Sequence, residues 1–398
     1  MGPLAGLRII DMTSVVMGPY ATSILGDMGA DVIKLEPPDG DTIRKVGPSR
    51  SGEMGAMFLH ANRSKRGIVL DLKAEEGRAA LLRLAETADV LVHNLRPAPL
   101  DRLGLGWAAL SAVNPRLIHL GAFGYGQDGP YAARPAYDDL IQGAAGIPAL
   151  LGRSGGDGPR YVPVNIADRA VGLHAAIAIL AALRHRDATG QGQCIEMPMF
   201  ETMASLVLGD HLGGLSYEPP LDQGGYSRLL QARRRPCRTA DGWICVLLYN
   251  EKHWRAFVAL SGREDLAADP RFRDQASRSR EGAAVYELLS AVMATRTTAE
   301  WEKLLDEADI PHSPMNDLEG LATDPHLAAI GFFRDEDHPV EGKIRSMRVP
   351  SRWSASQPEP SRLAPRLGEH TREVLAEAGM SPAEIEALLA RGIAKAAP

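Results

Sequence analysis

Hydrophobic and polar positions along the first 125 residues follow two alternating periods. Val/Ile/Leu-rich runs of strand length, with Gly or Pro nearby, occupy residues 7–13, 31–36, 67–73, 89–95 and 116–124. Between several of these runs, at 19–30 and 74–88, apolar residues recur at helical spacing. This alternation predicts βαβ units. The chain is therefore expected to be an α/β protein with a Rossmann-like, mostly parallel sheet and helices on its faces.

A long apolar helix is predicted from Asp168 to Arg186, followed by a polar turn and a strand at 194–200. Asp just before a helix is a favoured N-cap, because its carboxylate accepts a backbone N–H and faces the positive end of the helix dipole. At that position it should be ionised at neutral pH, which is the form that attacks an acyl carbon. The pattern leaves both roles open for Asp168, helix cap and nucleophile. The helical spacing rests on the apolar residues Leu173, Ala176, Ile177, Leu180 and Leu183.

The pattern changes after about residue 220. A polar, basic stretch at 221–242 precedes a strand at 243–249 and three helices at 252–262, 281–295 and 297–308. Two helix starts carry the Ser/Thr-x-x-Glu signature of a capping box, Thr297 with Glu300 and Ser381 with Glu384. We therefore expect two domains: a large one formed by residues 1–224 and 326–398, and a small α+β domain over 225–325.

Composition narrows the function classes. The 398 residues carry a formal charge of -6, with 44 Lys and Arg against 50 Asp and Glu spread along the chain, which argues against nucleic acid or an anionic membrane as the main partner. Three cysteines without C-x-x-C spacing indicate neither a disulfide framework nor a zinc site, and fit a reducing cytoplasm. No targeting segment is recognised at the N-terminus, and the longest apolar run is too short to span a bilayer.

The sequence bears on two kinds of cofactor site, a dinucleotide site and a metal site. A strand, a glycine at position 18, a helix and a second strand ending in Glu36 follow the outline of a dinucleotide-binding βαβ unit, so an NAD-linked oxidoreductase is one alternative. However, the first turn, "TSVVMGPYATSILG", lacks the several glycines that a pyrophosphate needs, which favours a Rossmann-like scaffold without NAD. The eleven histidines form no metal-binding motif, so we expect no metal and no permanently bound cofactor.

Several long segments resemble one enzyme family. "LRIIDMTSVVMGPYATSILGDMGADVIKLEPPDGD", "NRSKRGIVLDLK", "VHNLRPAPLDRLGLGW" and "IADRAVGLHAAIAILAALRHRDATGQGQ" occur in the order and spacing of the class III CoA-transferases. This group includes formyl-CoA and carnitine CoA-transferases and the related α-methylacyl-CoA racemases. The resemblance extends over essentially the whole chain, although it does not specify a substrate.

The resemblance implies a mechanism centred on Asp168. In the family, the aspartate before the long helix attacks the donor thioester to form an acyl anhydride, and the released CoA thiolate converts this anhydride into an aspartyl-CoA thioester. The acceptor carboxylate then attacks that thioester, and CoA returns to make the new acyl-CoA. CoA is thus a co-substrate, and the partners are an acyl-CoA and a small carboxylic acid. The family also forms interlocked homodimers, which we expect here.

The resemblance also implies binding residues. Lys73, Arg96 and Arg102 could meet the phosphates of CoA, because arginine suits bidentate contacts and all three stand in loops after strands. A lid over the acyl group maps onto Gly224 and Gly225, followed by a basic segment that contains Arg234. The full set expected to bind CoA is Val16, Met17, Leu70, Leu72, Lys73, Asn94, Leu95, Arg96, Arg102 and Tyr137.

Two departures from the family affect the substrate. Val16 stands where the formyl-CoA branch has glutamine, which argues against formyl-CoA and oxalate. Tyr137 stands where the racemase branch has a histidine, so a two-base racemase would lack one of its bases. A CoA-transferase is therefore the favoured function, with a racemase of the same family or a CoA-binding protein without turnover as alternatives. The donor and the acceptor are not identified.

Overall fold

The computed structural model describes residues 2–155 and 157–397 and divides into two compact units. The first unit contains the chain up to Ala145, Pro163–Ser205 and the chain from Ala328 onward. The second contains Gly146–Val162 and Leu206–Leu327. The division into domains at residues 225 and 325 stays a prediction.

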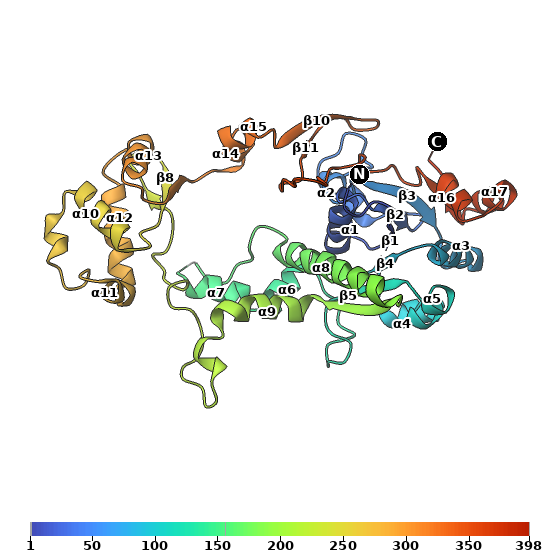
Figure 1. Ribbon diagram of the computed structural model, residues 1–398, viewed down its shortest axis with the longest axis horizontal. Coiled ribbons are helices and arrows are strands. Elements are labelled where there is room, and N and C mark those ends of the chain that lie inside the picture. The colour runs from blue at the N-terminus through green and yellow to red at the C-terminus, as the bar shows by residue number, and fades with distance from the viewer. Residues whose placement is uncertain (1, 156, 398) are drawn as a thin grey trace. The chain divides into compact units, whose positions relative to one another are not determined.

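A seven-stranded sheet with the order β12-β3-β2-β1-β4-β5-β6 forms the centre of the first unit (Figure 1). β1 to β6 run parallel, in the order typical of a doubly wound nucleotide-binding sheet, and only β12 is antiparallel. The predicted α/β class with a mostly parallel sheet is thus confirmed. The strands are β1 (Arg8–Met12), β2 (Asp31–Glu36), β3 (Lys65–Leu70), β4 (Val90–His93), β5 (Ile118–Phe123), β6 (Gln193–Pro198) and β12 (Ala394–Lys395).

Helices cover both faces of this sheet. Alternate residues of the strands, such as Ile10, Ile33 and Leu91, form one apolar core with α3, α4, α5, α16 and α17. On the other face lie α1 and α8, which pack side by side (Figure 1). The bounds are α1 (Met17–Asp27), α3 (Glu75–Glu86), α4 (Pro97–Arg102), α5 (Trp107–Val113), α8 (Ile166–Thr189), α16 (Thr371–Glu377) and α17 (Pro382–Ala390).

Four fully buried charges lie in and beside the sheet, on the face covered by α1. Lys65 Nζ lies 2.8 Å from Asp11 Oδ2, and Lys34 Nζ lies 2.9 Å from Asp41 Oδ2. Burial opposes ionisation of Asp11, but Lys65 and Lys34 hold the pKa of its carboxyl well below the usual range. Burial lowers the pKa of Lys65 to about 8, although the charge of Asp11 opposes this effect. Burial also acts to lower the pKa of Lys34, but the charges of Asp11, Asp41 and Glu36 outweigh it and raise that pKa. The two pairs therefore form one network of compensated charges.

Helix α8 differs from its prediction in two respects. It begins at Ile166, so Asp168 is its third residue and Asn165 occupies the N-cap position. Of the two roles left open for Asp168, that of the helix N-cap is therefore excluded. Leu173 and Ile177, two of its periodic apolar residues, are 46% and 62% exposed. The buried face consists largely of small residues because α8 lies close to α1: a Cβ on Gly172 would stand 2.8 Å from the Met17 carbonyl oxygen.

The length and hydropathy of α8 would also suit a membrane-crossing segment, and within the described ranges no other helix meets that test. Half of its most apolar window is buried inside the protein. This burial is typical of a core helix, which passes the same test of length and composition.

The second unit has its own core of aromatic and aliphatic side chains, among them Trp254, Phe257 and Trp301. This core packs between helices and a three-stranded antiparallel sheet of order β7-β8-β9. The capping box predicted at Thr297 and Glu300 is present. The elements are α7 (Ile147–Arg153), β7 (Cys237–Arg238), β8 (Trp243–Val246), α10 (Glu251–Ser261), α11 (Gln275–Arg280), α12 (Gly282–Met293), α13 (Thr298–Glu307), β9 (His312–Pro314) and α14 (Leu318–Ala322).

The remaining elements include a hairpin that the sequence did not predict. β10 (Phe333–His338) pairs antiparallel with β11 (Gly342–Met347), although both strands are rich in charged residues. The last helix, α17, begins with the predicted capping box at Ser381 and Glu384. The other helices are α2 (Ala56–Ala61), α6 (Asp138–Ala144), α9 (Met199–His211) and α15 (Pro325–Ala329), with short 3-10 turns at Thr42–Lys45, Gly213–Ser216 and Glu264–Ala267.

Candidate active site

The carboxyl edge of the parallel sheet collects most of the residues that the sequence singled out. Loops after β1, β3, β4 and β5 leave the sheet at this edge, because parallel strands end on the same side. Helix α8 returns the chain from the end of β5 to the start of β6, so its N-terminus lies at this edge too. Asp168, in the first turn of α8, is thereby brought to the side of the sheet where ligands of such folds bind.

Asp168 lies half-buried beside a second carboxylate. Its backbone N–H donates to Asp138 Oδ1 at 2.9 Å, and Asp138 Oδ2 accepts from Gln142 Nε2 at 2.6 Å. The guanidinium of Arg169 lies over the ring of Tyr20, 4.4 Å from its centroid. Among the described residues, none donates a hydrogen bond to the Asp168 carboxylate, so its oxygens are available to an incoming group.

This environment favours the neutral form of Asp168. Burial and the negative charge of Asp138 together raise the pKa of its carboxyl to about 7, against the opposing effect of Arg169. The expectation that the helix N-terminus holds Asp168 fully ionised at neutral pH was therefore wrong. The helix dipole is a weak effect of about 0.3–1 kcal/mol at a surface, and here the burial and the neighbouring carboxylate outweigh it.

Hydrogen bonds join the loops after β1 and β4. Ser14 N–H donates to Asn94 Oδ1 at 3.2 Å, and Asn94 Nδ2 donates to the Ser14 carbonyl at 3.0 Å. Val15 adopts a left-handed conformation, with φ of 71°, and its N–H donates to Asp41, a member of the buried charge network. The network therefore fixes the backbone next to Val16 and Met17.

The residues expected to bind CoA fall into two groups at this edge. Val16, Met17 and Leu70 are almost wholly buried, with 1%, 5% and 0% of their surface exposed. Lys73, Arg96 and Arg102 are exposed, and no ion pair joins them to another described residue. Of the others, Leu72 and Asn94 are half-buried, while Leu95 and Tyr137 are 37% and 66% exposed.

The expected substrate loop belongs to the second unit. Gly224 and Gly225 both have positive φ, 70° and 98°, which explains why glycine stands at these two positions. Arg234 is exposed and has no ion pair in the described part of the chain, whereas its neighbour Arg233 lies 3.5 Å from Glu287.

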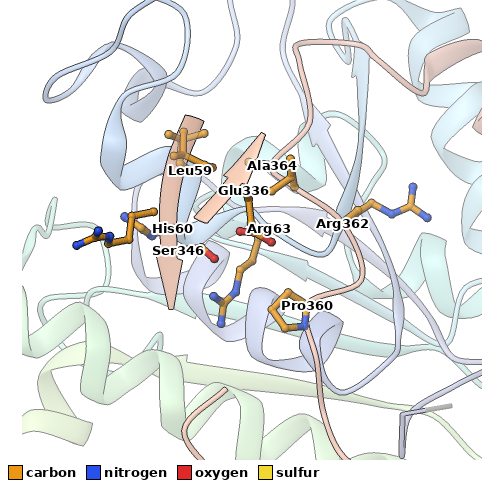
Figure 2. A pocket seen from close by; sticks show the side chains of 11 residues that line it. Leu59, His60, Arg63, Glu336, Ser346, Pro360, Arg362 and Ala364 are labelled. Carbon is orange, nitrogen blue, oxygen red and sulfur yellow. The ribbon is translucent and has the colours of Figure 1, made fainter. Parts of the chain in front are cut away.

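A small pocket in the first unit lies between α2 and the β10–β11 hairpin (Figure 2). Its volume is about 30 Å³, enough for one or two water molecules and too little for a substrate. His60 and Arg63 line it, and Arg63 pairs with Asp27 at 2.7 Å. Burial, Arg63 and Arg169 together lower the pKa of His60. This pocket is part of the scaffold.

Asp138 and Arg169 are the site residues that sequence reasoning missed. Asp138 follows Tyr137 directly but carries no motif of its own, and it lies 30 residues before Asp168. The spacing of apolar residues could not show that α6 and the start of α8 are neighbours. Within the described ranges, no group of three or more His, Cys, Asp or Glu side chains could hold a metal ion.

Comparisons with known proteins agree with this geometry. A family model described as CoA-transferase family III matches residues 4–371. A succinate–glutarate CoA-transferase from Agrobacterium fabrum is 35% identical, with 94% of this chain and 95% of that protein covered. A probable fatty acyl-CoA transferase from Mycobacterium tuberculosis is 32% identical, with 94% and 98% covered.

A solved structure shares the fold. The crystal structure of a CAIB/BAIF family protein from Brucella suis superimposes with a TM-score of 0.81 and 33% identity, covering 95% of this chain and 99% of that one. The family match extends over almost the whole chain and includes Asp168, Asp138 and every loop at the carboxyl edge. The alternative of an NAD-linked oxidoreductase is thereby removed. The chain belongs to CoA-transferase family III and is a CoA-transferase.

Proposed function

We propose that the enzyme moves CoA from an acyl-CoA donor to a carboxylic acid through covalent intermediates on Asp168. One observation supports this role above the others: the Asp168 carboxylate lies at the ligand-binding edge of the sheet with no hydrogen-bond donor from the described residues. A carboxylate that is half-buried and unpaired is a stronger nucleophile than a hydrated one, because less solvent must leave before it attacks.

The transfer takes place in four steps. The Asp168 carboxylate attacks the donor thioester carbonyl, forms a mixed anhydride and releases CoA thiolate. The thiolate attacks the aspartyl carbonyl of the anhydride, which releases the donor acid and leaves aspartyl-CoA. The acceptor carboxylate attacks this thioester and again releases CoA thiolate. The thiolate then attacks the acceptor carbonyl of the second anhydride, which gives the new acyl-CoA and restores the Asp168 carboxylate.

Replacement of Asp168 by asparagine tests this role directly. We expect Asp168→Asn to lose at least about 10³-fold in transfer activity, because an amide cannot form the anhydride. It should melt within about 4 °C of wild type, since the lost dipole interaction is small and the cost of burying a charge is removed. The measurement is thioester exchange followed by chromatography, with Asp139→Asn on the exposed side of α6 as the matched control. Wild-type turnover by undeamidated Asp168→Asn would contradict the proposal.

The position of Asp138 leads to a prediction about pH. The ionised form of Asp168 attacks, so kcat/KM for the donor should fall about tenfold per pH unit below the pKa near 7 and level off above it. Asp138→Asn keeps an oxygen for the Asp168 N–H but removes the negative charge, so the rise in activity should move to lower pH.

The matched control for this pH profile is Asp139→Asn, which removes the same charge from the same turn of α6. It should leave the profile in place, because Asp139 does not affect the pKa of Asp168. If both variants gave the wild-type profile, or if the wild-type rise lay near pH 4, the assignment of the pH-dependent step to Asp168 would be wrong.

For CoA itself, we propose that Lys73, Arg96 and Arg102 meet the phosphates, while Leu72, Asn94, Leu95 and Tyr137 line the rest of the site. Val16, Met17 and Leu70, which are almost wholly buried, would support that site from the core. The support is geometric, since the three cations are exposed at one edge of the sheet and form no ion pair with a carboxylate in the described part of the chain. Such cations can bind phosphate without first breaking an ion pair.

Neutral replacement of Lys73 or Arg102 should therefore weaken CoA binding, and the loss should shrink at high salt, which screens the wild-type contact. Calorimetric titration with CoA at two salt concentrations provides the measurement. Arg184→Gln is the control, because Arg184 lies 16 residues after Asp168 along α8, about 24 Å away toward the other edge. If all variants bound CoA as tightly as the wild type, Lys73 and Arg102 would be solvated surface charges and not CoA ligands.

We propose further that the acceptor carries a second carboxylate, which the lid segment with Gly224, Gly225 and Arg234 recognises. Arg234 has no partner among the described carboxylates, and the relative from Agrobacterium fabrum is named for two dicarboxylates, succinate and glutarate. The relative named as a fatty acyl-CoA transferase favours a monocarboxylate instead. Dicarboxylate and monocarboxylate acceptors should therefore be compared directly.

Acceptor competition distinguishes these alternatives. Glutarate should exceed valerate, an acid of equal chain length, in kcat/KM, and Arg234→Ala should reduce that preference by about tenfold or more. Arg233→Ala, which removes a guanidinium that already pairs with Glu287, should change the preference little. A preference for valerate that survives Arg234→Ala would exclude a dicarboxylate acceptor.

The interlocked homodimer is also a proposal. Leu173 and Ile177 on α8 and Leu140 on the adjacent α6 are exposed apolar side chains in a single chain, which a partner subunit would cover. Light scattering should give twice the 42.8 kDa of one chain, and Leu173→Glu with Ile177→Glu should reduce that mass. A monomeric wild type would rule the homodimer out.

A further inference from the structure

Arg169 follows the proposed nucleophile directly in α8 and takes no part in the transfer steps given above. Its guanidinium lies over the ring of Tyr20 on α1, 4.4 Å from the ring centroid. The side chain is half-buried, and in the part of the chain that the structure describes no carboxylate forms a salt bridge with it. The ring of Tyr20 stabilises the cation only in part, because it brings no negative charge. Arg169 can therefore bind an anion without first breaking an ion pair.

The contact with Tyr20 holds the guanidinium near Asp168. Asp168 and Gly172 are four residues apart in α8, so they lie on one face of the helix. The ring of Tyr20 lies against this face, because a Cβ on Gly172 would stand 3.1 Å from Tyr20 Cδ1. Arg169 thus stacks on a ring that lies one helical turn away from Asp168.

The charge of Arg169 acts on titratable groups of two helices. Burial raises the pKa of Asp168, and the charge of Arg169 opposes that rise. Burial also lowers the pKa of His60 on α2, and the charges of Arg63 and Arg169 add to this effect. Arg63 already pairs with Asp27 at 2.7 Å. Of these two arginines, Arg169 is therefore the one whose charge can attract a further anion.

The proposed reaction changes the charge beside Arg169. In the free enzyme, the ionised Asp168 carboxylate repels an incoming acid anion. Once Asp168 has become the aspartyl-CoA thioester, that negative charge is gone, whereas a guanidinium stays protonated. The remaining carboxylate, Asp138, already accepts hydrogen bonds from the Asp168 N–H and from Gln142. Arg169 therefore attracts a carboxylate most strongly in the state that must react with the acceptor acid.

We propose that Arg169 binds the reacting carboxylate of the acceptor acid and holds it against the aspartyl-CoA thioester. This inference rests on the proposed function of Asp168. In the step concerned, one carboxylate oxygen bonds to the aspartyl carbonyl carbon, the C–S bond breaks and CoA leaves as the thiolate, so no proton is transferred. The guanidinium holds the other oxygen. Because every acceptor has this carboxylate, Arg169 serves monocarboxylates and dicarboxylates alike, unlike the role proposed for Arg234.

Replacement of the charge by a neutral side chain separates the two half-reactions. With succinyl-CoA as donor, Arg169→Gln should reduce kcat/KM for glutarate and for valerate by about tenfold or more each, because a charged hydrogen bond to the acid is lost. At pH 8, kcat/KM for succinyl-CoA should change little. A role only in lowering the pKa of Asp168 would affect the donor instead, because Asp168 carries no charge when the acid reacts.

Two variants accompany this measurement. Arg169→Lys keeps a positive charge, so it should recover part of the lost activity toward both acids. Arg184→Gln removes the same charge from an exposed position near the other end of α8 and should change neither half-reaction.

A binding experiment does not depend on the choice of donor. Asp168→Asn replaces the carboxylate by a neutral amide and so has the charge of the thioester. At pH 8, where wild-type Asp168 is ionised, saturation-transfer NMR should show valerate bound to Asp168→Asn about fivefold or more tightly than to wild type. Addition of Arg169→Gln to that variant should remove the gain, whereas addition of Arg184→Gln should keep it.

Failure of this inference is distinguishable from failure of the proposed function. Arg169→Gln treated with acyl-CoA alone should still carry CoA on Asp168, which also shows that the variant is folded. If wild type gave no such adduct, the proposed function would be wrong. If the adduct formed but both acids reacted with wild-type kcat/KM, or if valerate bound Asp168→Asn no better than it bound the double variant with Arg169→Gln, only the assignment of Arg169 would be wrong.

Discussion

The buried network of Asp11, Lys65, Lys34 and Asp41 is the constraint on which the carboxyl edge of the sheet depends. All four charges are buried, and removing one partner from such a pair costs about 3–5 kcal/mol because the other charge is left uncompensated. Asp41 also accepts from Val15 N–H, and Lys34 donates to the Thr13 carbonyl. These two hydrogen bonds hold the loop after β1 in place, so the helix that follows it, α1, starts at a defined position.

The position of α1 in turn determines the position of Asp168, the proposed nucleophile. Because α1 starts where the network places it, the Met17 carbonyl meets Gly172 of α8, and only a glycine allows this close approach. The contact sets the start of α8 beside α6, where Asp138 accepts from the Asp168 N–H. Burial and this neighbouring carboxylate then raise the pKa of Asp168 toward neutrality. The contact between α1 and α8 thus connects the buried charge network to the proposed nucleophile, Asp168.

Sequence reasoning succeeded where the signal was local. The parallel sheet followed from the alternation of apolar periods, and both capping boxes from a Ser/Thr and a Glu three residues apart. It failed where the outcome depended on distant residues. The pKa of Asp168 depends on Asp138, 30 positions earlier, and the exposure of Leu173 depends on the close contact between α8 and α1. The rings of His93 and His119 lie 4.7 Å apart because two paired strands bring them together, which no spacing in the sequence indicates.

The most direct test of the account is to trap the covalent enzyme. Wild-type protein quenched with acid soon after mixing with an acyl-CoA, and then digested, should give a peptide containing Asp168 that carries the mass of the acyl group or of CoA. Hydroxylamine should remove this mass, because it cleaves anhydrides and thioesters but not amides. If the quenched enzyme carried no added mass during turnover, or carried it on another residue, Asp168 would not be the nucleophile.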